Sequence, residues 1–342
     1  MIQSNIELTP GKKPIKAVGL LSGGLDSTVA AKIIQDLGVE VYGVYFAMPW
    51  GCCDKGKAQQ AADKLGINFI VLQLDERYLE IVRSPKHGYG SALNPCVDCR
   101  IHMFSRAAQY MKSIEADFVF TGEVLGQRPM SQMHKSMKWI EEGTGLVGRL
   151  VRPLCAQLLE PTIPEKEGLI DRTKMLRISG RSRSEQLQLA DQYEIKDYSA
   201  TGGGCLLTDQ HFARQMKDTL QYGYRNFRET VALKWGRHFR IDKDFKFILG
   251  RDQDENSALK SYAHADDHII ELPDQSGPTL ILKGYNPTEE LFARAAGFIQ
   301  MHSKHKNAEP IEAHYWPASQ PNNKKFIRAQ KINNEMMETT RI

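Results

Sequence analysis

Apolar residues in the first 160 positions fall into short runs that alternate with segments of helical spacing. Short apolar runs bounded by polar residues are typical of buried strands, whereas apolar residues three and four positions apart are typical of amphipathic helices. The predicted strands cover 15–21, 39–46, 68–74 and 117–121, and the predicted helices cover 27–37, 55–65 and 104–114. This alternation predicts an α/β fold with a doubly wound parallel sheet.

The pattern changes after residue 150. A proline-bearing connector (153–164), a predicted helix (184–193) and a glycine run (202–204) lead to short β-type segments at 238–241, 245–249, 268–272 and 279–282. These segments predict a separate, smaller α+β domain. We therefore expect a leader (1–14), an α/β domain (15–160), a connector (161–230), a second domain (231–320) and a basic, partly mobile tail (321–342).

Bulk composition narrows the class of protein. The 342 residues are 41% hydrophobic and 25% charged, which is typical of a globular protein rather than a disordered one. No apolar run approaches the roughly 20 residues that span a bilayer, and the first residues lack the apolar core of a signal peptide, so a cytoplasmic location is expected. The net charge of +4 supports a nucleic-acid partner only weakly. Six cysteines are too few for a disulfide scaffold.

A glycine turn follows the first predicted strand. Ser22, Gly23 and Gly24 precede Asp26 and Ser27 at the start of a predicted helix. Such a turn lets the backbone approach a phosphate, and the helix N-terminus offers free N–H groups. The spacing of a Walker A loop is missing. A plain capped turn is the alternative interpretation of a double glycine alone.

The complete string SGGLDSTVAA resembles the signature of the PP-loop ATP pyrophosphatases. The resemblance implies a fold like that of the adenine nucleotide alpha hydrolases. It also implies that ATP is split into AMP and pyrophosphate while a substrate is adenylated. Ser22, Gly23, Gly24, Asp26 and Ser27 would grip the phosphates, with Mg²⁺ assisting and Asp26 essential for the chemistry.

Cysteines are a second group of candidate functional residues. Cys96 and Cys99 form a C-x-x-C in the string NPCVDCR, just ahead of a predicted helix, and Cys205 follows three glycines. Such a pair suits redox, zinc or cluster roles, and a helix N-terminus lowers the pKa of a thiol. The alternative for Cys205 is that it is a small, buried apolar residue without a chemical role. Cys155 is expected to be structural, and Cys52 and Cys53 either bind an ion or sulfur or pack in a loop.

NPCVDCRIHMF is similar to the stretch that carries the first catalytic cysteine of the tRNA 2-thiouridine synthases, within the PP-loop tRNA thiouridine synthases. Cys99 and Cys205 would be the catalytic cysteines. Several enzymes of this superfamily hold a [4Fe–4S] cluster on three cysteines, which would be Cys96, Cys99 and Cys205 here. The alternative is cluster-free, with a persulfide on Cys205 that Cys99 attacks. The resemblance favours the cluster, since Cys96 otherwise has no role.

Further charged residues lie near the expected site. Glu123 ends the strand at 117–121 and would coordinate Mg²⁺ or orient ATP, and Arg128 would meet phosphate. Arg181 and Arg183, ahead of the predicted helix 184–193, would hold the tRNA backbone. A capped loop with solvated charges is the alternative for each of them.

The final third resembles the RNA-binding NFACT-R module. The residues that carry this resemblance are Arg237-His238-Phe239-Arg240, followed by Gly250-Arg251-Asp252 and Glu255-Asn256. Arg237, Arg240 and Arg251 would contact phosphates and Phe239 would stack on a base. A solvated β-ribbon is the alternative.

Together the resemblances imply that the chain adenylates a uridine carbonyl in tRNA and replaces its oxygen with sulfur. Sulfide would come free or from a donor such as a cysteine desulfurase. Two other hypotheses remain at this stage. One is a PP-loop enzyme that adenylates a small molecule, and the other is an RNA-binding protein with a degenerate nucleotide site.

Overall fold

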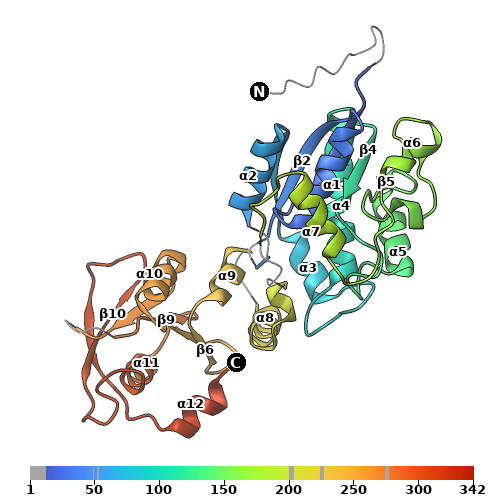
Figure 1. The fold of residues 1–342 in the computed structure, drawn as a ribbon. Coiled ribbons are helices and arrows are strands. Elements are labelled where there is room, and N and C mark those ends of the chain that lie inside the picture. Colours follow the sequence, from blue (N-terminus) through green and yellow to red (C-terminus); the bar gives the residue numbers. More distant parts are fainter. Residues whose placement is uncertain (1–12, 49, 52–53, 200–203, 224–226, 274–276) are drawn as a thin grey trace. The chain divides into compact units, whose positions relative to one another are not determined.

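The computed structural model describes residues 13–48, 50–51, 54–199, 204–223, 227–273 and 277–342 (Figure 1). The chain divides into two compact units, Met1–Thr208 and Asp209–Ile342. Most of the predicted leader, Cys52, Cys53 and two residues of the glycine run lie outside the described residues.

The first unit contains a five-stranded parallel sheet in the order β3-β2-β1-β4-β5. Its strands are β1 (Lys16–Leu20), β2 (Glu40–Ala47), β3 (Asn68–Gln73), β4 (Phe118–Thr121) and β5 (Leu150–Val151). Its helices are α1 (Leu25–Asp36), α2 (Lys55–Leu65), α3 (Arg77–Arg83), α4 (Cys96–Ser113), α5 (His134–Thr144), α6 (Ile163–Lys166) and α7 (Ser184–Gln192). Single 3₁₀ turns lie at Ala156–Leu158, Arg172–Lys174 and Leu206–Thr208.

Helices cover both faces of this sheet. Right-handed crossovers place α1 and α2 on one face and α4 and α5 on the other, and α7 packs on α1. The buried face of α1 joins residues of β1, β4 and α7 in one apolar core. The strand order reverses between β1 and β4, and ligands of open α/β sheets bind beyond the carboxyl ends of the strands at such a point. The glycine turn after β1 lies at this position.

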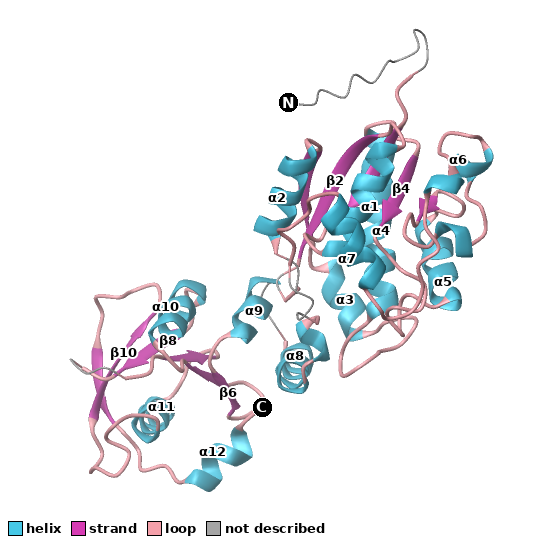
Figure 2. Cartoon of the chain, in the orientation of Figure 1, coloured by secondary structure: helices cyan, strands magenta, loops and turns pink. Residues whose placement is uncertain are grey.

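The second unit contains a six-stranded antiparallel sheet in the order β11-β10-β8-β9-β7-β6 (Figure 2). Its strands are β6 (Arg237–Arg240), β7 (Lys246–Leu249), β8 (His268–Glu271), β9 (Leu280–Lys283), β10 (Glu312–Pro317) and β11 (Lys325–Arg328). Its helices are α8 (Gln210–Tyr222), α9 (Phe227–Val231), α10 (Gln253–Tyr262), α11 (Glu289–Met301) and α12 (Asn334–Thr340), with a 3₁₀ turn at Ala232–Lys234.

Helix α11 packs on one face of the second sheet. Phe298 from this helix meets Phe239 of β6 and Phe247 of β7 edge to face, with ring centroids 5.0 and 5.3 Å apart. On the opposite face a smaller core joins Leu259 of α10 to Trp316 of β10 and neighbouring strand residues. The sheet is therefore covered on both faces over its central strands.

The predicted fold class is confirmed: a parallel sheet with helices and a separate, smaller domain. Two features differ from the prediction. Helix α4 begins at Cys96, eight residues before the predicted helix, so both cysteines of the C-x-x-C lie in its first turn. Residues 321–342, predicted as a tail, contribute β11 and α12, because Ile327 and Ile332 pack into the core beneath the basic side chains.

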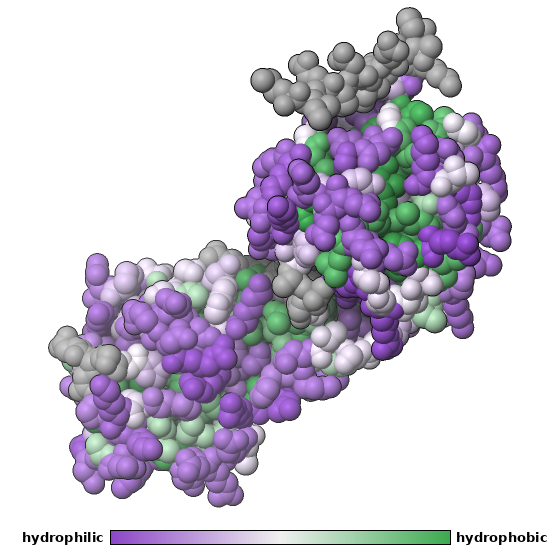
Figure 3. Space-filling view, viewed as in Figure 1, coloured by the Kyte–Doolittle hydropathy of each residue, from purple (hydrophilic) through white to green (hydrophobic). Residues whose placement is uncertain are grey.

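Hydrophilic residues cover most of the visible surface of each unit (Figure 3). Among the helices that the structure describes, none combines the length and the apolar character needed to cross a bilayer.

Candidate active site

The turn after β1 is built by hydrogen bonds within the loop. The Ser27 hydroxyl donates to the carbonyl of Gly24 at 2.9 Å and lies 3.1 Å from the Ser22 hydroxyl. The Gly24 amide donates to the Ser22 hydroxyl at 3.3 Å. Gly24 is the residue before α1, and it has no side chain that could cap the helix. The first N–H groups of α1 therefore face the carboxyl edge of the sheet and are suited to an anion.

Two glycines are required here by close approach. Gly23 has φ of +74°, and a Cβ on it would lie 2.6 Å from the backbone nitrogen of Ala58. Gly122, directly after β4, would place a Cβ 2.5 Å from the backbone of Asp26. The loops after β1 and β4 thus touch backbone to backbone, and any larger residue would push them apart.

The Asp26 carboxylate lies at this contact. It accepts a hydrogen bond from the Gln127 amide at 3.0 Å and pairs with Arg183 at 3.5 Å. Arg183, predicted to hold RNA, instead lies beside the turn at 22–27, which is the predicted phosphate loop. It does so because the segment before α7 runs along the loop after β4. Arg181 and Arg128 are exposed, and their predicted contacts with tRNA and phosphate stay predictions.

Polar atoms without partners surround this loop. The Oε1 atom of Gln127, the Nε atom of Arg183 and the Oγ atom of Ser199 are buried and have no hydrogen-bond partner among the described residues. Ser199 is tied to the loop, since its amide donates to the Gly23 carbonyl at 2.7 Å. Buried polar atoms normally find partners. Together with the glycine cradle, they fit a polar ligand such as the triphosphate of ATP.

The three candidate cysteines are brought together from two distant segments. Cys96 and Cys99 lie in the first turn of α4, and the loop that carries Cys205 is fastened beside it. The Leu93 amide donates to the Leu207 carbonyl at 3.0 Å, and the Leu206 amide donates to the Trp50 carbonyl at 3.3 Å. The thiols are near enough to influence one another electrostatically.

Cys99 is buried against an aromatic pair. Tyr78 donates its hydroxyl to the Cys99 thiol at 3.2 Å and stacks on Trp50 with ring centroids 5.8 Å apart. Burial raises the pKa of the Cys99 thiol to about 12; the Tyr78 hydrogen bond lowers it, while Cys96 and Cys205 raise it further. Burial opposes the predicted activation of this thiol at the start of α4, because loss of water disfavours the thiolate. No pattern in the sequence pointed to Tyr78.

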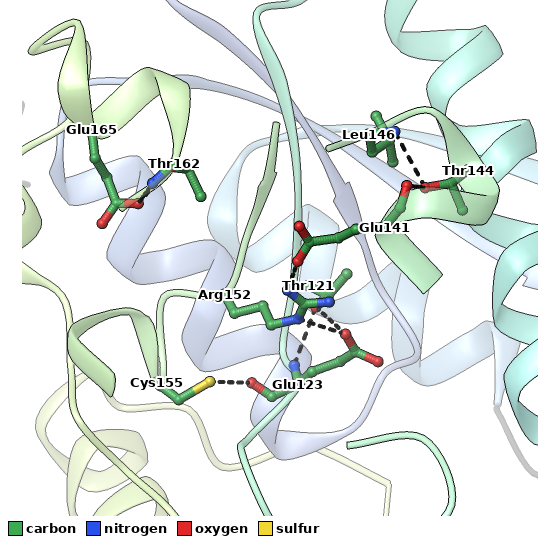
Figure 4. A network of polar contacts seen from close by, with 9 residues as sticks. All are labelled: Thr121, Glu123, Glu141, Thr144, Leu146, Arg152, Cys155, Thr162 and Glu165. Carbon is green, nitrogen blue, oxygen red and sulfur yellow. Dashed lines mark hydrogen bonds and ion pairs between the residues drawn. The ribbon is translucent and has the colours of Figure 1, made fainter. Parts of the chain in front are cut away.

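Arginine and glutamate side chains connect the cysteines to β4. Arg100 hydrogen-bonds the side chain of Cys96 and donates to Glu123 at 2.7 Å. Arg152 donates to the other oxygen of Glu123 at 3.0 Å and also pairs with Glu141 (Figure 4). Glu123 is only 3% exposed. Both of its oxygens already accept from guanidinium groups, and the predicted contact of Glu123 with Mg²⁺ or ATP stays a prediction.

The residues do not fit a [4Fe–4S] cluster. Among the described residues, no three His, Cys, Asp or Glu side chains are placed to hold one metal ion. The predicted ligand set of Cys96, Cys99 and Cys205 is therefore not supported. Cys155 is fully buried, as predicted for a structural residue, and its thiol points to the Glu123 carbonyl (Figure 4).

The predicted RNA contacts of the second unit need correction. Phe239 is 1% exposed and belongs to the core, so it cannot stack on a base. Arg240 forms two hydrogen bonds to Asp218, at 2.8 and 2.7 Å, because its strand packs against α8. Arg251 pairs with Glu255 while half of its side chain stays exposed. Burial lowers the pKa of Arg237, which is half-buried. RNA contacts by Arg237 and Arg251 stay predictions.

Two family models match the chain. Residues 15–138 match the tRNA methyl transferase HUP domain, and residues 236–340 match the NFACT protein RNA binding domain. The first match lies in the α/β unit and the second in the unit with the antiparallel sheet. The two matches confirm the predicted resemblance of both parts.

Curated relatives match part of the chain. A tRNA-specific 2-thiouridylase from Tropheryma whipplei is 32% identical over 145 residues, which is 37% of this chain and 40% of the relative. The corresponding protein of Acidothermus cellulolyticus is 29% identical over 69% of this chain and 66% of its own length. The chain thus spans about 40% of the length of the first of these relatives. A solved 4-thiouridine synthetase in complex with RNA and ATP shares 23% identity, with a TM-score of 0.36, over 60% of this chain and 51% of its own.

Proposed function

We propose that the protein uses ATP to adenylate a uridine carbonyl in tRNA and then replaces the carbonyl oxygen with sulfur. One structural observation carries this proposal: the phosphate loop and the cysteines belong to a single connected assembly. Gly122 presses on the backbone of Asp26, and the next residue, Glu123, binds Arg100 beside Cys99. A nucleotide held at the loop and a sulfur held on a thiol would therefore keep a fixed relation during the reaction.

The first step is adenylation. The uridine carbonyl oxygen attacks the α-phosphorus of ATP, pyrophosphate leaves, and the N3 proton of the base is released. Ser22, Ser27 and the N–H groups at the start of α1 hold the departing pyrophosphate, and Arg183 adds positive charge beside it. When bound, Mg²⁺ would offset phosphate charge, and Asp26 is the carboxylate placed to hold it.

The second step is sulfur transfer without a cluster. A sulfur-donor protein of the cysteine desulfurase type would load Cys205 as a persulfide. The Cys99 thiol attacks the inner sulfur of that persulfide, which leaves a Cys99–Cys205 disulfide and releases hydrogen sulfide. The sulfide adds to the ring carbon, and AMP leaves with one proton while N3 regains the other. A dithiol reductant then restores both cysteines.

Tyr78 is the residue that makes Cys99 usable in this scheme. A thiol with a pKa of about 12 is a poor nucleophile at neutral pH, because the thiolate is the reacting form. The Tyr78 hydroxyl, 3.2 Å from the sulfur, stabilises negative charge as the Cys99 proton departs. Burial also protects Cys99 from unwanted oxidants until the persulfide is loaded.

The two steps can be tested separately. Asp26→Ala should abolish tRNA-dependent exchange of pyrophosphate into ATP, whereas Asp36→Ala, at the exposed end of the same helix, should leave it unchanged. Cys205→Ser should retain the exchange but yield no thiolated nucleoside by mass spectrometry of the tRNA. Thiolated tRNA from Cys205→Ser, or pyrophosphate exchange that needs no tRNA, would refute the proposal.

A further inference from the structure

One surface of the second unit combines exposed aromatic rings with unpaired positive charge. Phe326 of β11 is 60% exposed, and it lies directly across from His314 of β10 in the antiparallel register. Their rings meet edge to face with centroids 4.4 Å apart. The Nε2 atom of His314 is buried and has no hydrogen-bond partner among the described residues.

The strand alternation explains why these rings are uncovered. Tyr315 and Ile327 point to the side where α11 covers the sheet, so their neighbours His314 and Phe326 point to the other side. The core beneath α10 reaches Trp316 of β10 and stops short of β11. Phe326 consequently sits on the edge strand with one face open to solvent.

Basic residues lie beside the exposed face of Phe326. Lys324 places its ammonium group 4.8 Å from the centre of the Trp316 ring, and Arg328 follows Phe326 on the same side of β11. Residues 324–331 contain four lysines or arginines and no acidic residue. Among the described residues of these strands, Glu271 and Glu312 also lie on this face; Glu271 is paired with Lys260, and Glu312 lies opposite Arg328.

We propose that His314 and Phe326 form a stacking platform for an unpaired nucleotide of RNA, with Lys324 and Arg328 contacting the adjoining phosphates. This proposal rests on the proposed tRNA substrate and names the surface that binds it. Exposed aromatic rings beside basic residues suit bases that are free to leave a stack, as in loops and single-stranded ends.

An exposed aromatic residue on an edge strand has another use, which is to pair with a segment of a second protein. The lysines argue for RNA instead. Lysines on an edge strand discourage pairing with another strand, and they attract phosphate. Binding of RNA rather than peptide is the interpretation that uses both the rings and the charge.

The test measures binding of a labelled oligouridylate of about eight nucleotides to the full-length chain by fluorescence anisotropy, a length within the usual site size for single strands. Phe326→Ala should weaken binding about 5- to 150-fold, as expected for the loss of one base stack, whereas Phe326→Tyr should bind as the parent does. Tyr285→Ala is the matched control, since Tyr285 is 77% exposed in the same unit and follows β9, which β8 separates from β10 in the sheet. It should leave the affinity unchanged.

Three results would overturn the inference. They are an unchanged affinity for Phe326→Ala, an equal loss for Tyr285→Ala, or an equal loss for an RNA duplex of the same length, which offers no free base to stack on. A parent chain that thiolates tRNA while Phe326→Ala keeps the parent KM for tRNA would reject this surface alone. A parent chain that binds no RNA at all would reject the proposed function as well.

Discussion

Replacing Glu123 should destabilise the first unit strongly. The carboxylate is 3% exposed and accepts from Arg100 at 2.7 Å and from Arg152 at 3.0 Å, and Arg152 is itself 3% exposed. Glu123→Ala removes the shared partner and leaves two buried guanidinium groups, of which only Arg152 retains another carboxylate, that of Glu141. Breaking a buried pair from one side costs about 3–5 kcal/mol.

That loss converts into a large thermal shift. For a unit of this size, each kcal/mol lowers the unfolding midpoint by about 2–4 °C, so Glu123→Ala should lower it by roughly 6–20 °C. Scanning calorimetry of the full-length protein measures this directly. Glu115→Ala is the control, because its pair with Lys13 is exposed on both sides and its loss should not move the midpoint.

Glu123→Gln separates a structural role from a ligand role. Glutamine keeps one acceptor oxygen but loses the charge, so we expect a smaller loss of stability than for alanine, with the stabilisation that ATP adds unchanged. If instead Glu123→Gln kept the parent midpoint and abolished the added stabilisation by Mg²⁺ and ATP, Glu123 would be a ligand residue. The reasoning from the buried network would then be wrong.

Two pH-linked predictions follow from other buried groups. The pKa of about 12 predicts that iodoacetamide alkylates Cys99 roughly a thousand times more slowly at neutral pH than a thiol with the ordinary pKa of 9.0. The alkylation rate should keep rising about tenfold per pH unit past pH 9. Tyr78→Phe should slow the alkylation further, because the hydrogen bond from Tyr78 lowers the pKa of Cys99. Peptide mass spectrometry measures the alkylation of Cys99. An alkylation rate that levels off near pH 9 would show that burial does not raise the pKa of this thiol. Burial also lowers the pKa of His238 well below 6.5, so the unfolded chain binds its proton first and stability should fall as the pH drops below about 6.5. Chemical denaturation at pH 5 and pH 7 should show this fall in the parent and a smaller one in His238→Gln.

Local patterns predicted the elements that bury a regular apolar face. The four strands of the first sheet that were predicted lie within one or two residues of β1 to β4, because each is a compact apolar run. Strand β11 was missed because its lysines and arginine dominate the pattern. An edge strand with one open face needs only a single inward residue, here Ile327, to be held in place.

The site could be predicted only in part for a related reason. The phosphate loop is contiguous, so its residues could be recognised together. Arg183 and Asp26 are 157 positions apart, and a solvated surface charge looks the same in sequence as a cation beside a phosphate. Phe239 was misassigned because flanking arginines suggested nucleic acid, although a four-residue strand between two packed layers buries its central residues.

The attachment of the Cys205 loop limits how sulfur can travel. Ser199 is fastened to Gly23 and Leu206 to Trp50, so six residues connect two fixed points and Cys205 adjoins one of them. Neighbouring Cα atoms are about 3.8 Å apart, which keeps the Cys205 backbone within that radius of its anchor. A cysteine that accepted sulfur at one place and delivered it at another would need a long flexible segment on both sides. In the proposed reaction, the sulfur donor would therefore have to reach Cys205 beside Cys99, and loading and delivery of the sulfur would occur at the same place.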